Sequence, residues 1–219
     1  MDVYFDHVTP APLAGTLNSE VHSEIPSEIW RRSLKLEGNK KYQVYAPSGK
    51  GKSTFIHIIY GLRNDYEGEV KLNDQNVRKI SLKSWAKLRQ DQIAVVFQDL
   101  RLFEHLSARE NILVKTALYP KDYRAEIEDL AEYFGVNFLL DKKTYQLSYG
   151  ERQRIAIIRA LIQPFTLLLM DEPFSHLDEE NIRKACLKID QRCQENKAGL
   201  IMTSLGYPYY IEFDQRIIL

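Results

Sequence analysis

Apolar runs alternate with amphipathic stretches along most of the chain, and this alternation predicts strands and helices in turn. A short continuous apolar run bounded by turn residues is typical of a buried strand. The predicted strands are KKYQVYA at 40–46, QIAVVFQ at 92–98, TLLLMDEP at 166–173, LIMTS at 200–204 and RIIL at 216–219. Because helical segments separate these strands, the pattern predicts a mainly parallel α/β core.

A helix-rich stretch interrupts this alternation in the middle of the chain. Two pairs of residues have the spacing of a capping box, which marks the start of a helix: Ser107 with Glu110, and Ser148 with Glu151. We therefore expect a helical insertion at approximately residues 99–160. The segment GEVKLNDQNV at 68–77 predicts a hairpin in an antiparallel sheet at the edge of the fold.

Composition limits the class of protein. The chain has 219 residues, which suits a single domain over 1–219. Lys plus Arg and Asp plus Glu both number 30, so no overall basic charge indicates a nucleic-acid partner, and we expect none. Hydrophobic residues make up 44% and charged residues 27%, which is typical of a soluble globular fold.

The number of cysteines and the length of the apolar runs indicate in which cellular compartment the protein is expected. Cys186 and Cys193 lie seven residues apart on one apolar helical stripe, which predicts core packing rather than a disulfide scaffold. No stretch approaches the roughly 20 apolar residues of a membrane-spanning helix. The first residues also lack the basic and apolar regions of a signal peptide. We expect a soluble, cytoplasmic protein that reaches a membrane only through a partner.

The segment APSGKGKST, residues 46–54, has the pattern of a phosphate-binding loop. It lies between a predicted strand and a predicted helix, as such a loop requires. Small residues let backbone N–H groups surround a phosphate, Lys52 is expected to reach the β- and γ-phosphates, and Ser53 to ligate Mg²⁺. Ala46 replaces the first glycine of G-x-x-x-x-G-K-[ST]. The alternative, an ordinary Gly-Lys turn, does not explain the flanking elements.

Two carboxylates follow the apolar strand that ends in MDEP, residues 170–173. Asp171 is expected to hold Mg²⁺ and Glu172 to orient and deprotonate a water that attacks the γ-phosphorus. Carboxylates after a strand are a weak signal alone, because many loops carry them. Together with the phosphate loop they predict a nucleotide hydrolase.

The segment LSYGERQR at 147–154 completes a set of motifs that resembles the ATP-binding cassette (ABC) ATPases over most of the chain. The family signature reads LSGGQ; here Ser148 and Gly150 match, and Tyr149 replaces the first glycine. The resemblance implies that this helix N-terminus faces the γ-phosphate held by a second subunit. It also implies that Gln98, in VVFQD, meets Mg²⁺ or the attacking water, and that Asp178, in SHLD, lies near the dimer interface.

The resemblance implies a site made from these motifs. It comprises Glu172, Gln98 and Lys52 as catalytic groups; Ser48, Gly49, Lys50, Gly51, Lys52, Ser53, Thr54, Ser148, Gly150 and Ser204 as ATP-binding groups; and Ser53, Gln98 and Asp171 as Mg²⁺ ligands. The implied fold is a P-loop NTPase core with an antiparallel edge sheet and an inserted helical subdomain.

The resemblance also implies a function and partners. The chain is expected to hydrolyse ATP as a subunit of an ABC transporter, peripheral at the inner membrane through a separate transmembrane permease, and to dimerise with ATP bound. The motif style is similar to the ATPases of lipoprotein-release, macrolide-efflux and cell-division systems. A groove near Gln98 and residues 99–106 is expected to receive a permease helix, with Leu100, Leu102 and Phe103 exposed to it or packed in the core.

Two positions depart from the family pattern. Ser204 stands where the family places a switch histidine, and serine lacks the reach and charge of imidazole. Residues 9–20 contain no aromatic side chain to stack on adenine; His22 and Trp30 are the nearest substitutes, and neither is assigned.

Three alternatives remain beside the transporter ATPase. The first is an ABC-like module that binds ATP and dimerises with little hydrolysis, because Ser204 replaces the histidine; Glu172 argues against complete loss. The second is a soluble ABC ATPase acting on nucleic acid or ribosomes, which usually has two cassettes or long coiled-coil insertions. The third is a small-molecule P-loop kinase, a class of enzyme that has no need of the LSYGERQR segment at 147–154.

Overall fold

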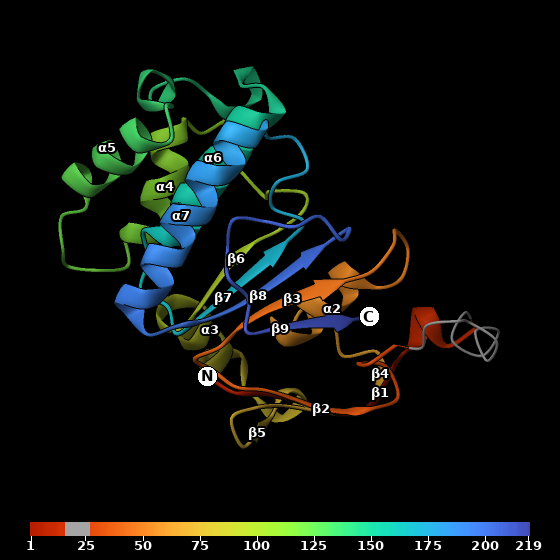
Figure 1. The fold of residues 1–219 in the computed structure, drawn as a ribbon. Helices are drawn as coiled ribbons and strands as arrows, with labels where there is room; N and C mark the ends of the chain where they lie inside the picture. Colours follow the sequence, from red (N-terminus) through yellow and green to blue (C-terminus); the bar gives the residue numbers. More distant parts are fainter. Residues whose placement is uncertain (16–26) are drawn as a thin grey trace.

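The computed structural model describes residues 1–15 and 27–219, which form two sheets with helices packed against them (Figure 1). The strands are β1 (Val3–Pro10), β2 (Ser33–Leu36), β3 (Lys41–Tyr45), β4 (Tyr66–Leu72), β5 (Gln75–Asn76), β6 (Ile93–Val96), β7 (Leu167–Asp171), β8 (Gly199–Ser204) and β9 (Gln215–Ile218). The helices are α2 (Lys52–Ile59), α3 (Leu82–Asp91), α4 (Ala108–Thr116), α5 (Arg124–Tyr133), α6 (Tyr149–Leu161) and α7 (Glu179–Asn196).

The larger sheet has five parallel strands in the order β6-β7-β8-β3-β9. Every residue of β7 and β8 is buried, because helices or the second sheet cover both faces. Leu168 and Met170 face a core formed with the helical part of the chain. Leu167 and Leu169 face a second core that includes α2 and the antiparallel sheet. Burial on both faces explains why the 166–171 strand reads as a continuous apolar run rather than an alternating one.

The smaller sheet is antiparallel, in the order β2-β1-β4-β5. The hairpin predicted at 68–77 is the β4–β5 pair, and its turn residue Asn73 has a φ of 51°. Asn tolerates this left-handed conformation better than most residues. The predicted edge hairpin is therefore confirmed.

The middle of the chain folds into helices that gather on one side of the parallel sheet (Figure 1). Both predicted capping boxes are present, at Ser107 before α4 and Ser148 before α6. The predicted stripe on α7 is also confirmed: Cys186 and Cys193 are buried and free. The boundaries 99–160 of a helical subdomain stay a proposal; α4, α5 and α6 lie within or overlap them.

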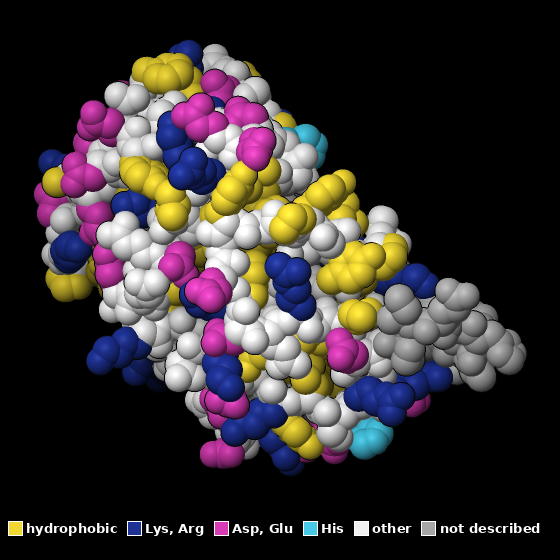
Figure 2. Space-filling model, in the orientation of Figure 1, with side chains coloured by type: hydrophobic (Ala, Val, Ile, Leu, Met, Phe, Trp, Pro, Cys, Tyr) yellow, Lys and Arg dark blue, Asp and Glu magenta, His cyan; other side chains and the backbone are white. Residues whose placement is uncertain are grey.

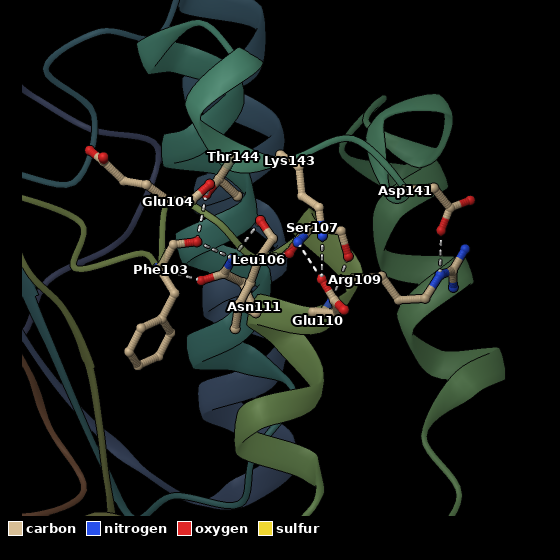
Figure 3. A network of polar contacts seen from close by, with 10 residues as sticks. All are labelled: Phe103, Glu104, Leu106, Ser107, Arg109, Glu110, Asn111, Asp141, Lys143 and Thr144. Atoms are coloured by element: carbon tan, nitrogen blue, oxygen red, sulfur yellow. Dashed lines mark hydrogen bonds and ion pairs between the residues drawn. The ribbon is translucent and has the colours of Figure 1, made fainter.

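A buried asparagine fixes the loop that enters the helical part (Figure 3). Asn111 Nδ2 donates hydrogen bonds to the carbonyl oxygens of Phe103 at 3.0 Å and Ser107 at 2.9 Å. Its Oδ1 accepts from the Phe103 amide at 2.8 Å. Thr144 Oγ1 also donates to the Phe103 carbonyl, at 2.9 Å. The loop backbone is therefore held while the Phe103 ring stays 55% exposed.

We expect Asn111→Ala to lower the free energy of unfolding by about 2–3 kcal/mol, since it leaves several buried backbone groups without partners. Urea unfolding followed by circular dichroism measures the change. The matched control is Asn196→Ala at the exposed end of α7, which should change the value by less than about 0.5 kcal/mol. Equal effects of the two substitutions would contradict the role given to this network.

Candidate active site

The predicted phosphate loop joins the end of β3 to the start of α2. Gly49 and Gly51 have φ values of 80° and 101°, a region that L-residues with a side chain rarely adopt. A Cβ on Gly51 would lie 2.5 Å from Leu13 Cδ1. Because Gly51 is also the N-cap of α2 and has no side chain, the helix N-terminus keeps its amides for a ligand.

Trp30 contacts this loop from the hydrophobic core. It is 3% exposed, its ring packs edge-on against Phe55, and its Nε1 donates to the Lys50 carbonyl at 3.4 Å. Trp30 is thus a core residue rather than an adenine platform. The other considered residue, His22, lies outside the described residues.

Lys52 occupies the centre of the site. Its side chain is 4% exposed, and Nζ donates to the carbonyl oxygens of Ala46 at 2.7 Å and Pro47 at 2.9 Å. The same Nζ lies 3.2 Å from Glu172 Oε1, and that carboxylate is 13% exposed. The structure therefore brings the predicted phosphate-binding cation and the predicted general base into direct contact.

The three predicted Mg²⁺ ligands meet at the carboxyl ends of the parallel strands. Ser53 Oγ donates to Gln98 Oε1 at 3.2 Å. Both residues line a hollow of about 360 Å³ with Asp171, a residue that is 1% exposed. Hydroxyl, amide and carboxylate oxygens are the hard ligands that Mg²⁺ prefers, so this donor set fits the ion.

Thr203 was not identified from the sequence, and it organises both carboxylates. Its Oγ1 donates to Asp171 Oδ1 at 2.7 Å and accepts a hydrogen bond from the Glu172 amide at 3.1 Å. Glu172 has a φ of 45°, so the backbone is strained where this carboxylate leaves β7. The one indication of this role in the sequence is that the apolar run 200–204 ends in two polar residues, Thr203 and Ser204.

Ser204 is fully buried beside the phosphate loop. Its Oγ accepts hydrogen bonds from Gln43 Nε2 at 3.1 Å and from the Gly206 amide at 3.3 Å. The Ser204 carbonyl accepts from the Ala46 amide at 3.3 Å. The hydroxyl is thus engaged by the protein, and its contact with a phosphate stays a prediction. Gln43, which holds it, gave no signal in the sequence.

The predicted signature residues lie at the N-terminus of α6. Ser148 caps the helix and is paired with Glu151, while a Cβ on Gly150 would lie 2.9 Å from the His176 carbonyl oxygen. Neither Ser148 nor Gly150 lines the Ser53 hollow of the same chain; from this segment only Tyr149 does.

A second hollow, of about 420 Å³, borders Glu172, and four of the residues that line it are aromatic: Phe174, Tyr207, Tyr209 and Tyr210. Phe174 and Tyr209 line it with ring centroids 4.9 Å apart, and burial raises the pKa of Tyr209 to about 12. The exposed Leu205 and Tyr207 follow β8. Figure 2 shows apolar side chains gathered on this face, between the helices and the ends of the parallel strands.

A third hollow, of about 220 Å³, lies between the parallel sheet and the helical part, and we call it the sheet–helix groove. It is lined by Tyr60, Val95, Phe97, Arg101, Phe103, Val114, Lys115, Arg159, Ala160 and Gln163. Three lining residues are cations and none is an acid. Burial lowers the pKa of Lys115 and brings that of Arg159 to about 10.

The sequence left exposure and core packing open for Leu100, Leu102 and Phe103, and the structure separates the three residues. Leu100 is 3% exposed and belongs to the helical core, because its backbone turns inward with a φ of 60°. Leu102 is partly buried against the same core, and Phe103 alone of the three is largely exposed.

No helix in the described ranges is long and apolar enough to span a bilayer.

Comparisons with known proteins agree with these motifs. A family model described as ABC transporter matches residues 31–175. The chain is 30% identical over 164 residues to the uncharacterized ABC transporter ATP-binding protein YvcR of Bacillus subtilis, a match that covers 74% of this chain and 63% of YvcR. It is 34% identical over 174 residues to the lipoprotein-releasing system ATP-binding protein LolD of Legionella pneumophila, covering 78% and 77%. The chain therefore spans less than two thirds of the length of YvcR.

A solved structure is also similar. The bacterial ABC transporter cassette MJ0796, described as dimeric, superposes with a TM-score of 0.76 and 25% identity over 92% of this chain and 87% of that one. A second structure of that cassette is described as a post-hydrolysis state bound to ADP and Pi. This likeness confirms the predicted fold class.

Proposed function

The chain belongs to the ABC transporter family, and from the contacts at its site we propose that it is an ATP-binding and ATP-hydrolysing subunit that powers transport through a separate membrane subunit. One observation carries this proposal: a buried Lys52 on a phosphate loop touches Glu172, next to the oxygen cluster of Ser53, Gln98 and Asp171. A cation for phosphates, oxygen ligands for a metal and a carboxylate for water are the groups that phosphoryl transfer needs.

Each group has a distinct task in the proposed reaction. The Lys52 ammonium exchanges the Ala46 and Pro47 carbonyls for phosphate oxygens, which also releases its contact with Glu172. The freed carboxylate can then orient a water and take its proton. Ser53, Gln98 and Asp171 would hold Mg²⁺, which supplies charge neutralisation of the phosphates when bound.

A second copy of the chain completes the site in this proposal. Ser148 and Gly150 do not line the Ser53 hollow of their own chain, so the N-terminus of α6 can serve another copy. The similar cassette MJ0796 is described as dimeric, which supports the same arrangement.

The sheet–helix groove is the proposed contact with the transmembrane permease. Phe103 offers an exposed ring on a loop held by Asn111, and Arg101, Lys115 and Arg159 supply positive charge. A permease helix with apolar side chains and at least one carboxylate suits this lining. This contact would place the chain at the cytoplasmic face of the inner membrane, with no role for nucleic acid.

Phosphate release from ATP by the purified chain, with Mg²⁺ or with EDTA, tests the proposal. We expect turnover that needs Mg²⁺ and disappears in EDTA. Tight ATP binding without phosphate release would instead favour the alternative of a dimerising module with little hydrolysis. The contact between Lys52 and Glu172 favours the hydrolase.

A further inference from the structure

Tyr149 is the position where this chain departs from the LSGGQ signature, and its side chain contacts the active site of its own chain. It is the first residue of α6. Its hydroxyl donates a hydrogen bond to the Gln98 carbonyl oxygen at 2.6 Å, across 51 residues of sequence. A glycine here would leave that carbonyl without this donor.

The Tyr149 ring is held in place by a second segment. Its centroid lies 4.1 Å from that of the His176 ring, with 44° between the planes. His176 is fixed in turn: its amide donates to Gln153 Oε1 at 3.3 Å, and its Nδ1 lies 2.9 Å from Ser175 Oγ. The phenol is thus packed between the segment after β7 and the segment after β6.

These contacts anchor Gln98 at both of its ends. Tyr149 binds the backbone carbonyl, and Ser53 binds the side-chain Oε1 at 3.2 Å. Tyr149, Gln98, Ser53 and Asp171 all line the same hollow.

We propose that Tyr149 is a positioning residue that acts through Gln98: it fixes the Gln98 backbone so that the amide oxygen stays beside Ser53, where Mg²⁺ would be held. This inference rests on the proposed function, which supplies the Mg²⁺ ion. The hydrogen bond between Tyr149 and Gln98 does not depend on that function. Because α6 carries the phenol, the helix N-terminus and Gln98 move together. A shift of α6 away from the 97–99 segment breaks the anchor.

Tyr149→Phe removes only the hydroxyl and keeps the ring against His176. Tyr133→Phe is the matched control, since Tyr133 also donates through its hydroxyl to a backbone carbonyl, that of Lys184, at 3.0 Å between α5 and α7. We expect faster amide hydrogen exchange at residues 97–101 of the nucleotide-free protein in Tyr149→Phe, and no change there in Tyr133→Phe. Equal exchange in Tyr149→Phe and wild type would overturn the proposal, whether or not the chain binds ATP.

The second measurement is Mg²⁺ titration of fluorescently labelled ATP bound to the chain, in a Glu172→Gln background where hydrolysis does not consume the nucleotide. We expect Tyr149→Phe to raise the half-saturating Mg²⁺ concentration about 5- to 10-fold, the loss expected for one hydrogen bond. Affinity for labelled ATP in EDTA should not change. In a Gln98→Ala background the same substitution should add nothing, because coupled residues are not additive.

The outcomes separate the two proposals. No binding of labelled ATP by the parent protein would contradict the proposed function. The hydrogen-exchange experiment would then still test whether Tyr149 holds the Gln98 backbone. Normal ATP binding with an unchanged Mg²⁺ requirement in Tyr149→Phe would overturn the positioning role and leave the proposed function standing. An effect that persists in Gln98→Ala would also overturn it, since Tyr149 would then act by another route.

Discussion

Lys52→Ala is expected to weaken ATP binding by about 100-fold or more, because each charge-assisted hydrogen bond to a phosphate contributes roughly 1.5–3 kcal/mol. The loss should be large since Lys52 Nζ is the group at the centre of the loop, within hydrogen-bonding distance of two loop carbonyls and 3.2 Å from Glu172. Titration calorimetry with ATP measures the affinity directly.

The control for this substitution is Lys40→Ala, which removes an exposed lysine paired with Glu37 and should leave ATP affinity unchanged. Circular dichroism verifies that Lys52→Ala is folded, as expected if the apolar cores on both sides of the parallel sheet stay intact. A folded Lys52→Ala protein with wild-type affinity would refute the phosphate-loop assignment.

Glu172→Gln is expected to lower turnover by roughly 10²-fold or more, the range expected for loss of a general base. The amide keeps the size of the side chain but cannot accept the proton of the water. ATP binding should persist, and the chain should accumulate as a nucleotide-bound dimer. Phosphate release measures the first effect, and light scattering measures the second as a doubling of the 25.6 kDa mass.

Glu195→Gln, on the exposed side of α7, is the control and should match wild type in both measurements. Loss of ATP binding in Glu172→Gln would contradict the assignment, since it would give Glu172 a structural or metal-binding role.

The sequence was sufficient for the parts of the site that depend on local structure. Apolar runs located the strands, and the motifs at their carboxyl ends predicted Ser53, Asp171 and Glu172 as parts of one site. Gln98 was assigned to that site by the resemblance to the ABC ATPases. Capping boxes likewise located the starts of α4 and α6, because a cap depends on residues three positions apart.

Contacts between distant segments could not be predicted in this way. Gln43 meets Ser204 only because β3 pairs with β8 in a particular register, and Thr203 meets Asp171 because β7 pairs with β8. In the sequence, Tyr149 is visible only as a substitution in the LSGGQ signature. Its hydrogen bond to Gln98 depends on how α6 packs beside β6. For Leu100 the sequence left exposure and core packing open, and only the folded backbone, with a φ of 60° at this residue, shows that it is in the core.

The most direct test of the proposed site is a crystal structure of Glu172→Gln with ATP and Mg²⁺. The proposal predicts two copies of the chain with the phosphates in the 46–54 loop of one copy and Ser148 of the other copy facing the γ-phosphate. It also predicts a metal ion beside Ser53 and Gln98, with Asp171 in contact directly or through water. Nucleotide bound elsewhere, or a metal held by other residues, would contradict it.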